Sequence, residues 1–319
     1  MILDTNPQML SDAIEATSQS MGINPLFVEK DYWITKLLMQ LSRSEYASNC
    51  VFKGGSALSK AHKLISRFSE DIDVAVITEQ LSGNQVKNLI SRVCKQMTQG
   101  LSEVEVEGLT SKGSRYRKSL YKYPATRPKS PFVADQIIVE VNSFGNPYPF
   151  EQKTISSFIG DYMAENGMTD MIEEYDMHPF QLNVLSSNRT LCEKMVSLIR
   201  FSFEDDAIAG LTSKVRHFYD LFYILKSDAT QRYIQTEFPK DLNALIAHDK
   251  DVFDIPPRWK LAATSSSVLF TDFSGLWNKI APIYERELST LAYRAIPGKD
   301  EIIADLEPFF HQVKEMIDE

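Results

Sequence analysis

Cysteine and histidine are both scarce in this chain of 319 residues. The three cysteines, Cys50, Cys94 and Cys192, lie far apart, and each stands in an apolar stretch. The five histidines show no spacing typical of metal ligands. Disulfides and a zinc site are therefore not expected, and the cysteines are predicted to be reduced core thiols of a cytoplasmic protein.

Long apolar runs are missing as well. The sequence contains no run of about 18 apolar residues, the length that a membrane-spanning helix needs. Residues 1–8 lack the basic segment and the apolar core of a signal peptide. With 43% hydrophobic and 24% charged residues, the composition predicts a soluble globular protein with no membrane partner.

A positive net charge is also absent. The chain carries 34 Lys and Arg against 43 Asp and Glu, a formal net charge of −9, which argues against a general nucleic-acid coat. The segment Lys112–Lys129 differs, because it is basic, contains no acid and has interleaved tyrosines. It is either an edge strand guarded by basic side chains or a surface that contacts a triphosphate or RNA. The candidate RNA-binding residues are Arg115, Arg117, Lys118 and Lys122.

The most informative motif that is present is a Gly-Gly-Ser turn. Gly54, Gly55 and Ser56 follow the apolar run Cys50–Phe52 and open an amphipathic stretch over Ala57–Ile65. Backbone N–H groups of such a turn can approach a phosphate closely, because glycine has no side chain in the way. The N-terminus of the following helix would also favour an anion. The turn is predicted to bind nucleotide phosphates, with the Ser56 hydroxyl donating to phosphate, capping the helix, or both.

Two aspartates follow this turn. Fourteen residues separate Ser56 from Asp71, and Asp73 comes two residues later in an alternating apolar run. A strand places residues i and i+2 on one face, so the two carboxylates would lie about 6–7 Å apart. Such a pair suits Mg²⁺ or Mn²⁺ bound to a nucleoside triphosphate, because phosphate oxygens supply the other ligands. The turn and the aspartates together indicate a nucleotidyltransferase, in which metal ions organise in-line attack on the α-phosphate.

Two further acids stand in apolar surroundings. Glu140 lies inside the apolar run Ile137–Val141, where an unpaired carboxylate would be costly to bury. It is predicted to be a third metal ligand from a neighbouring strand, and the alternative is a salt-bridged structural acid. Asp220 interrupts the largely apolar helix Phe218–Tyr223, so it is expected to have a specific partner.

The order of elements predicts an α/β fold with a mixed sheet and a helical C-terminal domain. Asn-Pro pairs at Asn6-Pro7 and Asn24-Pro25 predict two helices that end near Met21 and Arg43. Periodicity then predicts strands and helices in turn, and a helical pattern from about residue 155. The two domains are predicted to be residues 1–165 and 166–319. The later elements expected are strands over 72–77, 104–108, 115–123 and 136–143, and helices over 84–97, from 188, 212–225, 239–248, 273–291 and 299–317.

Three phrases closely resemble the AbiEii/AbiGii-type and MenT-type nucleotidyltransferase toxins: Val28–Thr35, Val51–Ala61 and Arg67–Asp73. This resemblance covers most of the chain. It implies a polymerase-beta-like core, an NTP substrate and Mg²⁺. It also implies a toxin in a toxin–antitoxin or phage-defence pair, with a cognate antitoxin. Several members of the family add nucleotides to the acceptor end of tRNA.

The resemblance also assigns residues in the C-terminal half. Lys194 matches a family lysine, which would neutralise charge on the triphosphate or on the leaving pyrophosphate. Asp220 matches the last acid of a second family motif and would hold that lysine or the acceptor. His217 stands where the family usually has an aspartate. Arg67 precedes the aspartate motif and would either screen phosphates or pair with surface acids.

The sequence therefore predicts a Mg²⁺-dependent nucleotidyltransferase toxin that transfers NMP from an NTP to RNA, with the tRNA 3′ end as the first candidate. One alternative is transfer of the nucleotide to a small molecule or to a protein hydroxyl. Another is a non-catalytic module that senses NTP by binding it.

Overall fold

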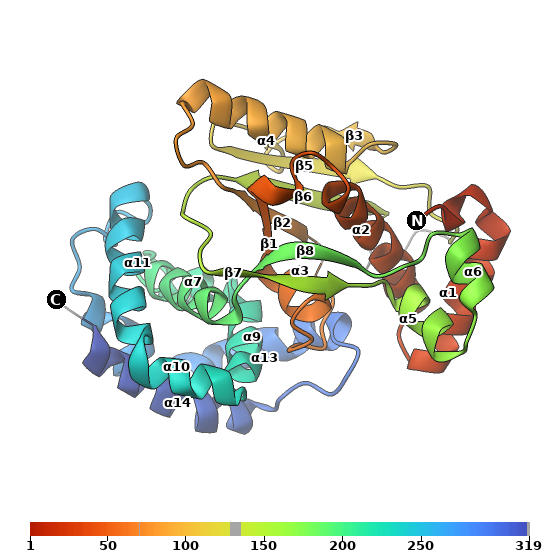
Figure 1. Cartoon of the computed structure of the whole chain (residues 1–319). Helices are drawn as coiled ribbons and strands as arrows, with labels where there is room; N and C mark the ends of the chain where they lie inside the picture. The colour runs from red at the N-terminus through yellow and green to blue at the C-terminus, as the bar shows by residue number, and fades with distance from the viewer. Residues whose placement is uncertain (70, 128–134, 318–319) are drawn as a thin grey trace. The chain divides into compact units, whose positions relative to one another are not determined.

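Figure 1 shows the helices and strands of the computed structural model of the protein. The chain divides into two units. The first contains residues 1–63 and 68–185, and the second contains residues 64–67 and 186–319. The structure describes residues 1–69, 71–127 and 135–317. The division falls between Leu185 and Ser186, whereas the sequence indicated a boundary near residue 165. The difference arises because the last strand of the sheet follows that point in the chain.

Two capped helices open the first unit, as the Asn-Pro pairs predicted. Helix α1 (Pro7–Met21) begins after Asn6, whose side chain accepts a hydrogen bond from the backbone of the first turn, and Gly22 caps its C-terminus. Helix α2 (Pro25–Ser42) begins after Asn24 in the same way. Proline suits the first helical position because its missing N–H would have no helical partner there.

A mixed sheet forms the centre of the first unit. Within the described residues it has eight strands in the order β3-β5-β6-β2-β1-β8-β7, with β4 paired to β5. β2 runs parallel to β6, and β1 runs parallel to β8, while the other pairs are antiparallel. The strands are β1 (Cys50–Lys53), β2 (Asp71–Val76), β3 (Ser102–Val104), β4 (Ser111–Lys112), β5 (Tyr116–Lys122), β6 (Gln136–Asn142), β7 (Phe150–Ile155) and β8 (Phe180–Leu185).

The two faces of this sheet differ in chemistry. β6 alternates buried and half-buried residues along its whole length, and β2 does so over its first four. The apolar set, which includes Ile72 and Val139, is fully buried. Helix α4 (Gly83–Met97) packs on β5 and β6, where Cys94 lies 3.2 Å from the Tyr121 hydroxyl. Tyr121 and Lys118 are three residues apart on β5, so Lys118 belongs to the opposite face.

Helix α3 (Gly54–Lys60) joins β1 to the chain that leads to β2. Its last residue, Lys60, pairs with Asp31 of α2, and both side chains are buried. The other carboxylate oxygen of Asp31 accepts from the backbone N–H of Phe158, at 2.8 Å, at the start of helix α5 (Phe158–Glu165). Asp31 belongs to Val28–Thr35, the first of the three phrases that resemble the family. Its contacts dock α2 onto the elements around the Gly-Gly-Ser turn.

The prediction of a helical pattern from about residue 155 was wrong for β8. After α5 and α6 (Thr169–Glu174), the chain returns to the sheet, and β8 pairs with both β1 and β7. A short, mostly apolar run such as Leu182–Leu185 fits a buried strand and a helix segment equally well by periodicity. The segment is a strand because it pairs with β1, at Phe52 and Val184, which are more than 100 residues apart in the sequence.

The second unit is helical in the residues described. The predicted helices over 212–225, 239–248, 273–291 and 299–317, and the one from 188, are present with small shifts in their ends. Residues 64–67 join this unit, since Arg67 bridges to Ala292 and the Tyr293 N–H donates to the Ser66 carbonyl at 3.0 Å. The helices are α7 (Ser187–Phe201), α8 (Ala207–Thr212), α9 (Val215–Leu225), α10 (Asp228–Thr236), α11 (Phe238–Val252), α12 (Val268–Thr271), α13 (Phe273–Leu291) and α14 (Lys299–Met316).

Aromatic side chains contact one another in the core of the second unit. Phe218 of α9 contacts Trp277 and Phe273 of α13, and Phe273 meets Phe310 of α14 edge to face.

Across the described residues of both units, no helix is long and apolar enough to span a membrane.

Candidate active site

A row of charged side chains crosses the middle of the sheet. The register pairs Lys53 of β1 with Asp73 of β2, and Asp73 with Glu140 of β6. Glu140 in turn pairs with Lys118 of β5. Residues paired directly across neighbouring strands point to the same face. We call Lys53, Asp73, Glu140 and Lys118 the charged row, and Asp71 lies beside it, two residues before Asp73 on the same face.

The Gly-Gly-Ser turn lies against this row at Gly54. Gly54 has φ +79°, a conformation that side chains other than glycine rarely adopt. A Cβ atom added there would lie 2.1 Å from Oδ2 of Asp73, which is well inside contact distance. Only glycine therefore lets the Asp73 carboxylate lie directly on the backbone of the turn. The structure brings the predicted phosphate-binding turn and the predicted metal-binding aspartate into contact.

Ser56 ties the same helix to β2. Its hydroxyl donates to the backbone carbonyl of Asp71 at 2.5 Å, and its side chain is buried. This bond holds α3 in register with the strand that carries both aspartates. The phosphate contact that the sequence predicted for Gly55 and Ser56 stays a prediction, because the Ser56 proton is used within the protein here.

Glu140 has partners of its own. Its Oε1 lies 2.8 Å from the Lys118 ammonium, and its Oε2 accepts from the Tyr116 hydroxyl at 3.0 Å. Among the described residues, no three His, Cys, Asp or Glu side chains are arranged to hold a metal ion between them. The role of Glu140 as a third metal ligand remains a prediction. The two aspartates fit a hard divalent cation by their chemistry, since both offer carboxylate oxygens on one face.

The second unit contains a buried carboxylate between two cations. Asp220 of α9 accepts two hydrogen bonds from the Arg67 guanidinium, each at 2.7 Å, and lies 2.7 Å from Nζ of Lys194 on α7. All three side chains are buried. Burial alone would raise the pKa of Asp220, but the charges of Arg67 and Lys194 outweigh it and hold that pKa well below its usual range. Asp220 is therefore ionised and holds both cations.

His217 completes this cluster. Its Nδ1 lies 3.4 Å from Nζ of Lys194. Burial lowers the pKa of His217 well below its ordinary value, and the Lys194 charge lowers it further, so the imidazole is neutral. An ammonium group only donates, so Nδ1 accepts and the ring proton lies on Nε2. The histidine that replaces the family's aspartate thus faces Lys194, three residues before Asp220 on the same side of α9.

The four candidate RNA-binding residues do not form one patch. Lys118 and Lys122 lie on the face of the charged row, and they pair with Glu140 and with Asp135. Arg117 lies on the α4 face and pairs with Glu103, at 3.1 Å. The sequence showed no acid within this segment, but other strands and loops supply the acids.

The remaining residues of the basic segment are held in similar ways. Arg115 donates to the Ser143 carbonyl at 3.1 Å. Lys112 pairs with Glu103 and Glu105. Lys129 lies outside the described residues. The predicted RNA interface therefore stays a prediction, with most of its charge already balanced by acids.

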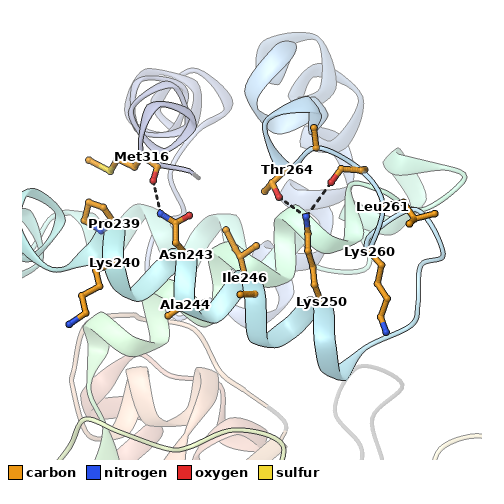
Figure 2. Close-up of a pocket in the computed structure, with 13 residues that line it drawn as sticks. Pro239, Lys240, Asn243, Ala244, Ile246, Lys250, Lys260, Leu261, Thr264 and Met316 are labelled. Atoms are coloured by element: carbon orange, nitrogen blue, oxygen red, sulfur yellow. Dashed lines mark hydrogen bonds between the residues drawn. The ribbon is translucent and has the colours of Figure 1, made fainter. Parts of the chain in front are cut away.

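A pocket of about 1000 Å³ lies in the second unit, beside α11 (Figure 2). Its walls are fixed by hydrogen bonds from Asn243 to the Met316 carbonyl, at 2.8 Å, and from Lys250 to Ala262 and Thr264. None of the described residues that line it is a site residue predicted from the sequence. The pocket is therefore not part of the candidate active site.

A mixed sheet in which a Gly-Gly-Ser turn meets paired aspartates is the arrangement of a nucleotidyltransferase. A family model described as nucleotidyl transferase AbiEii toxin, of type IV toxin–antitoxin systems, matches residues 36–303. The chain belongs to this family of nucleotidyltransferase toxins, and membership implies an antitoxin partner. No curated protein matches the sequence.

A solved structure supports the fold. The chain is similar to MenT4, a nucleotidyltransferase toxin from Mycobacterium tuberculosis H37Rv, with a TM-score of 0.53 and 14% sequence identity. The similarity covers 96% of this chain and 94% of MenT4. At this identity the likeness shows the fold alone, and it confirms the predicted nucleotidyltransferase fold with its mixed sheet.

Replacing Gly54 by alanine should destabilise the fold and disturb Asp73. The positive φ alone should cost about 1–2 kcal/mol, and the added Cβ must also push the Asp73 carboxylate aside. Gly22→Ala is the matched control, because Gly22 has φ +67° with nothing within 4 Å of its Cβ position. Urea unfolding should show a larger loss for Gly54→Ala than for Gly22→Ala, and the excess should shrink when Asp73→Ala is also present. Equal losses for the two variants would contradict the close contact.

Asp220→Asn should lower the free energy of unfolding by about 3–5 kcal/mol at pH 7, because two buried cations lose their counter-ion. The folded-state pKa of Asp220 lies below the unfolded value of about 3.9, so its stabilisation is complete above that pH. It declines as the pH falls toward the folded-state pKa, and the gap between wild type and variant should narrow accordingly. Denaturant titrations over an acid pH series measure this.

The control for that series is Asp254→Asn, since the Asp254 side chain is 85% exposed and its ion pair with Lys260 should contribute little. That variant should unfold like the wild type at every pH. If Asp220→Asn has the same free energy of unfolding as the wild type at pH 7, the buried carboxylate does not hold the cluster together.

Proposed function

We propose that this AbiEii-family enzyme transfers a nucleoside monophosphate from an NTP to an RNA acceptor, with the 3′ end of tRNA as the first candidate. The observation that carries the proposal is the contact between Gly54 and Asp73. It joins a backbone turn able to approach phosphates to a carboxylate able to hold their metal ion. Loss of acceptor function in tRNA would explain toxicity, and control of that toxicity by an antitoxin would serve phage defence.

Asp71 and Asp73 would hold Mg²⁺, or Mn²⁺ in its place. The bound metal would neutralise phosphate charge and organise in-line displacement of pyrophosphate. Gly54 and Gly55 would bring backbone N–H groups to the triphosphate. Glu140 is left out of this proposed metal site, because it pairs with the Lys118 ammonium, whose positive charge would repel a metal ion.

Lys194 would neutralise the negative charge that builds up as pyrophosphate leaves. Three observations support a fixed ammonium there: the buried Asp220 counter-ion at 2.7 Å, the neutral His217 at 3.4 Å, and burial of the lysine itself. Arg67 shares Asp220 with Lys194, so the same carboxylate positions both cations. In this arrangement Asp220 acts through Lys194 rather than on the substrate.

The acceptor is proposed to be RNA because a chain of net charge −9 has one long acid-free basic segment, Lys112–Lys129. Arg115, Arg117, Lys118 and Lys122 are its candidate contacts. An RNA strand would have to compete with the acids that pair with most of them. Proteins and small molecules are the alternative acceptors. Following which of the three classes receives a labelled nucleotide distinguishes between them.

The proposal predicts that label from one α-³²P NTP appears on tRNA when the protein is incubated with Mg²⁺, total RNA and total cell protein. Asp71→Asn and Asp73→Asn should each reduce this transfer at least about a thousandfold, equivalent to ~4 kcal/mol of transition-state stabilisation. Glu151→Gln, a half-exposed acid on β7 of the same sheet, is the matched control. If the label appears on protein or on small molecules instead, RNA is not the acceptor. Full activity of both aspartate variants would refute the proposed metal site.

Lys194→Met should lower kcat more than it raises the KM for NTP, because its charge is needed most as pyrophosphate leaves. Steady-state kinetics with saturating acceptor measures the two constants separately. The variant should stay folded, because Arg67 continues to neutralise Asp220. An unchanged kcat would return Lys194 to a purely structural role beside Asp220.

A further inference from the structure

Glu140 is already satisfied as a carboxylate. One oxygen faces the Lys118 ammonium at 2.8 Å, and the other accepts the Tyr116 hydroxyl proton at 3.0 Å. A divalent cation bound to Glu140 would share its oxygens with these partners, and it would stand next to the positive charge of Lys118. Both interactions come from β5, which pairs with β6 over its whole length, so the strand register itself holds them in place. Glu140 is therefore better suited to hold Lys118 than to bind a metal ion.

Lys118 faces a strongly anionic part of the sheet. Glu140 lies beside it, and Asp73 and Asp71 lie beyond Glu140 on the same face. Burial alone would lower the pKa of Lys118, but Glu140, and then Asp71 and Asp73, raise it above its ordinary value. The Lys118 side chain is 25% exposed, so a ligand at the sheet surface can reach it. Lys118 is thus a charged, accessible group that its neighbours hold at the site.

We infer that Lys118 binds a phosphate oxygen of the nucleotide, with Glu140 as its counter-ion, and that Asp71 and Asp73 alone among the described residues bind the metal ion. This inference rests on the proposed function and names a further substrate-binding residue for it. An ammonium group has three donors, so Lys118 can donate to phosphate while it keeps its bond to Glu140. No covalent step is involved.

The charges of the row are consistent with this arrangement. Lys53 and Lys118 stand at its two ends, and Asp73 and Glu140 stand between them. A metal ion on Asp71 and Asp73 would neutralise one part of a triphosphate, and Lys118 would neutralise another. Lys118 was predicted from the sequence as an RNA contact, but its position beside Glu140 and the aspartates favours the nucleotide instead.

The test measures binding rather than activity. Isothermal titration with Mn²⁺ alone reports the metal site, and titration with tripolyphosphate in the presence of Mn²⁺ reports phosphate binding without a base. The central variant is the double substitution Lys118→Met with Glu140→Gln, because it removes both members of the pair and leaves the net charge unchanged. Asp73→Asn serves as the reference for loss of a metal ligand. Thermal unfolding and circular dichroism confirm that each variant is folded.

The double variant should keep the Mn²⁺ affinity of the wild type within about threefold, while Asp73→Asn weakens it at least about tenfold. Lys118→Met should weaken tripolyphosphate binding about tenfold, a change of ~1.4 kcal/mol, and Lys118→Arg should recover most of that loss. Lys153→Met is the matched control. Lys153 lies on β7 of the same sheet, is 32% exposed and pairs with Glu151 rather than Glu140, so its removal should leave tripolyphosphate binding unchanged.

Two results would overturn the inference alone. The first is loss of Mn²⁺ binding in the double variant as large as in Asp73→Asn, which would make Glu140 a metal ligand. The second is unchanged tripolyphosphate binding in Lys118→Met together with weaker tRNA binding, which would make Lys118 an RNA contact. If Asp73→Asn itself keeps wild-type Mn²⁺ affinity, the metal site of the proposed function fails, and this inference fails with it.

Discussion

The contact between Gly54 and Asp73 is the constraint on which the candidate site depends. A strand that ends at Lys53 pairs with the strand that carries Asp73, so the turn after the first strand must pass directly by that carboxylate. Only a residue without a side chain, in a left-handed conformation, allows this passage. Ser56 then binds the Asp71 carbonyl and prevents the turn from sliding along the strand. Direct contacts therefore join the turn to the aspartates.

Charge in this protein is arranged by pairing between segments that are distant in sequence. On the sheet, Lys118 and Glu140 come from different strands and balance each other beside the aspartates. In the second unit, Asp220 lies between Arg67 and Lys194, which are 127 residues apart in the chain. In both places a carboxylate holds a cation in position, at the cost of removing charges from water. Fixed cations suit phosphate chemistry, because they need no reorganisation when negative charge develops.

Several features could be predicted from the sequence because their causes are local. Asn-Pro caps mark the starts of α1 and α2, amphipathic periodicity marks α4, and alternation marks β2 and β6. The AbiEii family was recognised from three short phrases, and the family model confirms it. Strand β8 was missed because six residues carry too little periodicity to separate a strand from a helix, and long-range pairing with β1 decides its structure.

The sequence by itself determined the class of enzyme. The glycine turn, its spacing to two aspartates and the alternation around them all lie within one short stretch of chain, Gly54–Val76. Only the tertiary structure decided the partners of the charged groups. Sequence spacing cannot show that Glu140 faces Lys118, that Glu103 neutralises Arg117, or that a neutral His217 faces Lys194. The physical reason is that strand register and helix packing bring these groups together across long stretches of chain, and electrostatic interactions depend on distance in space rather than on position in sequence.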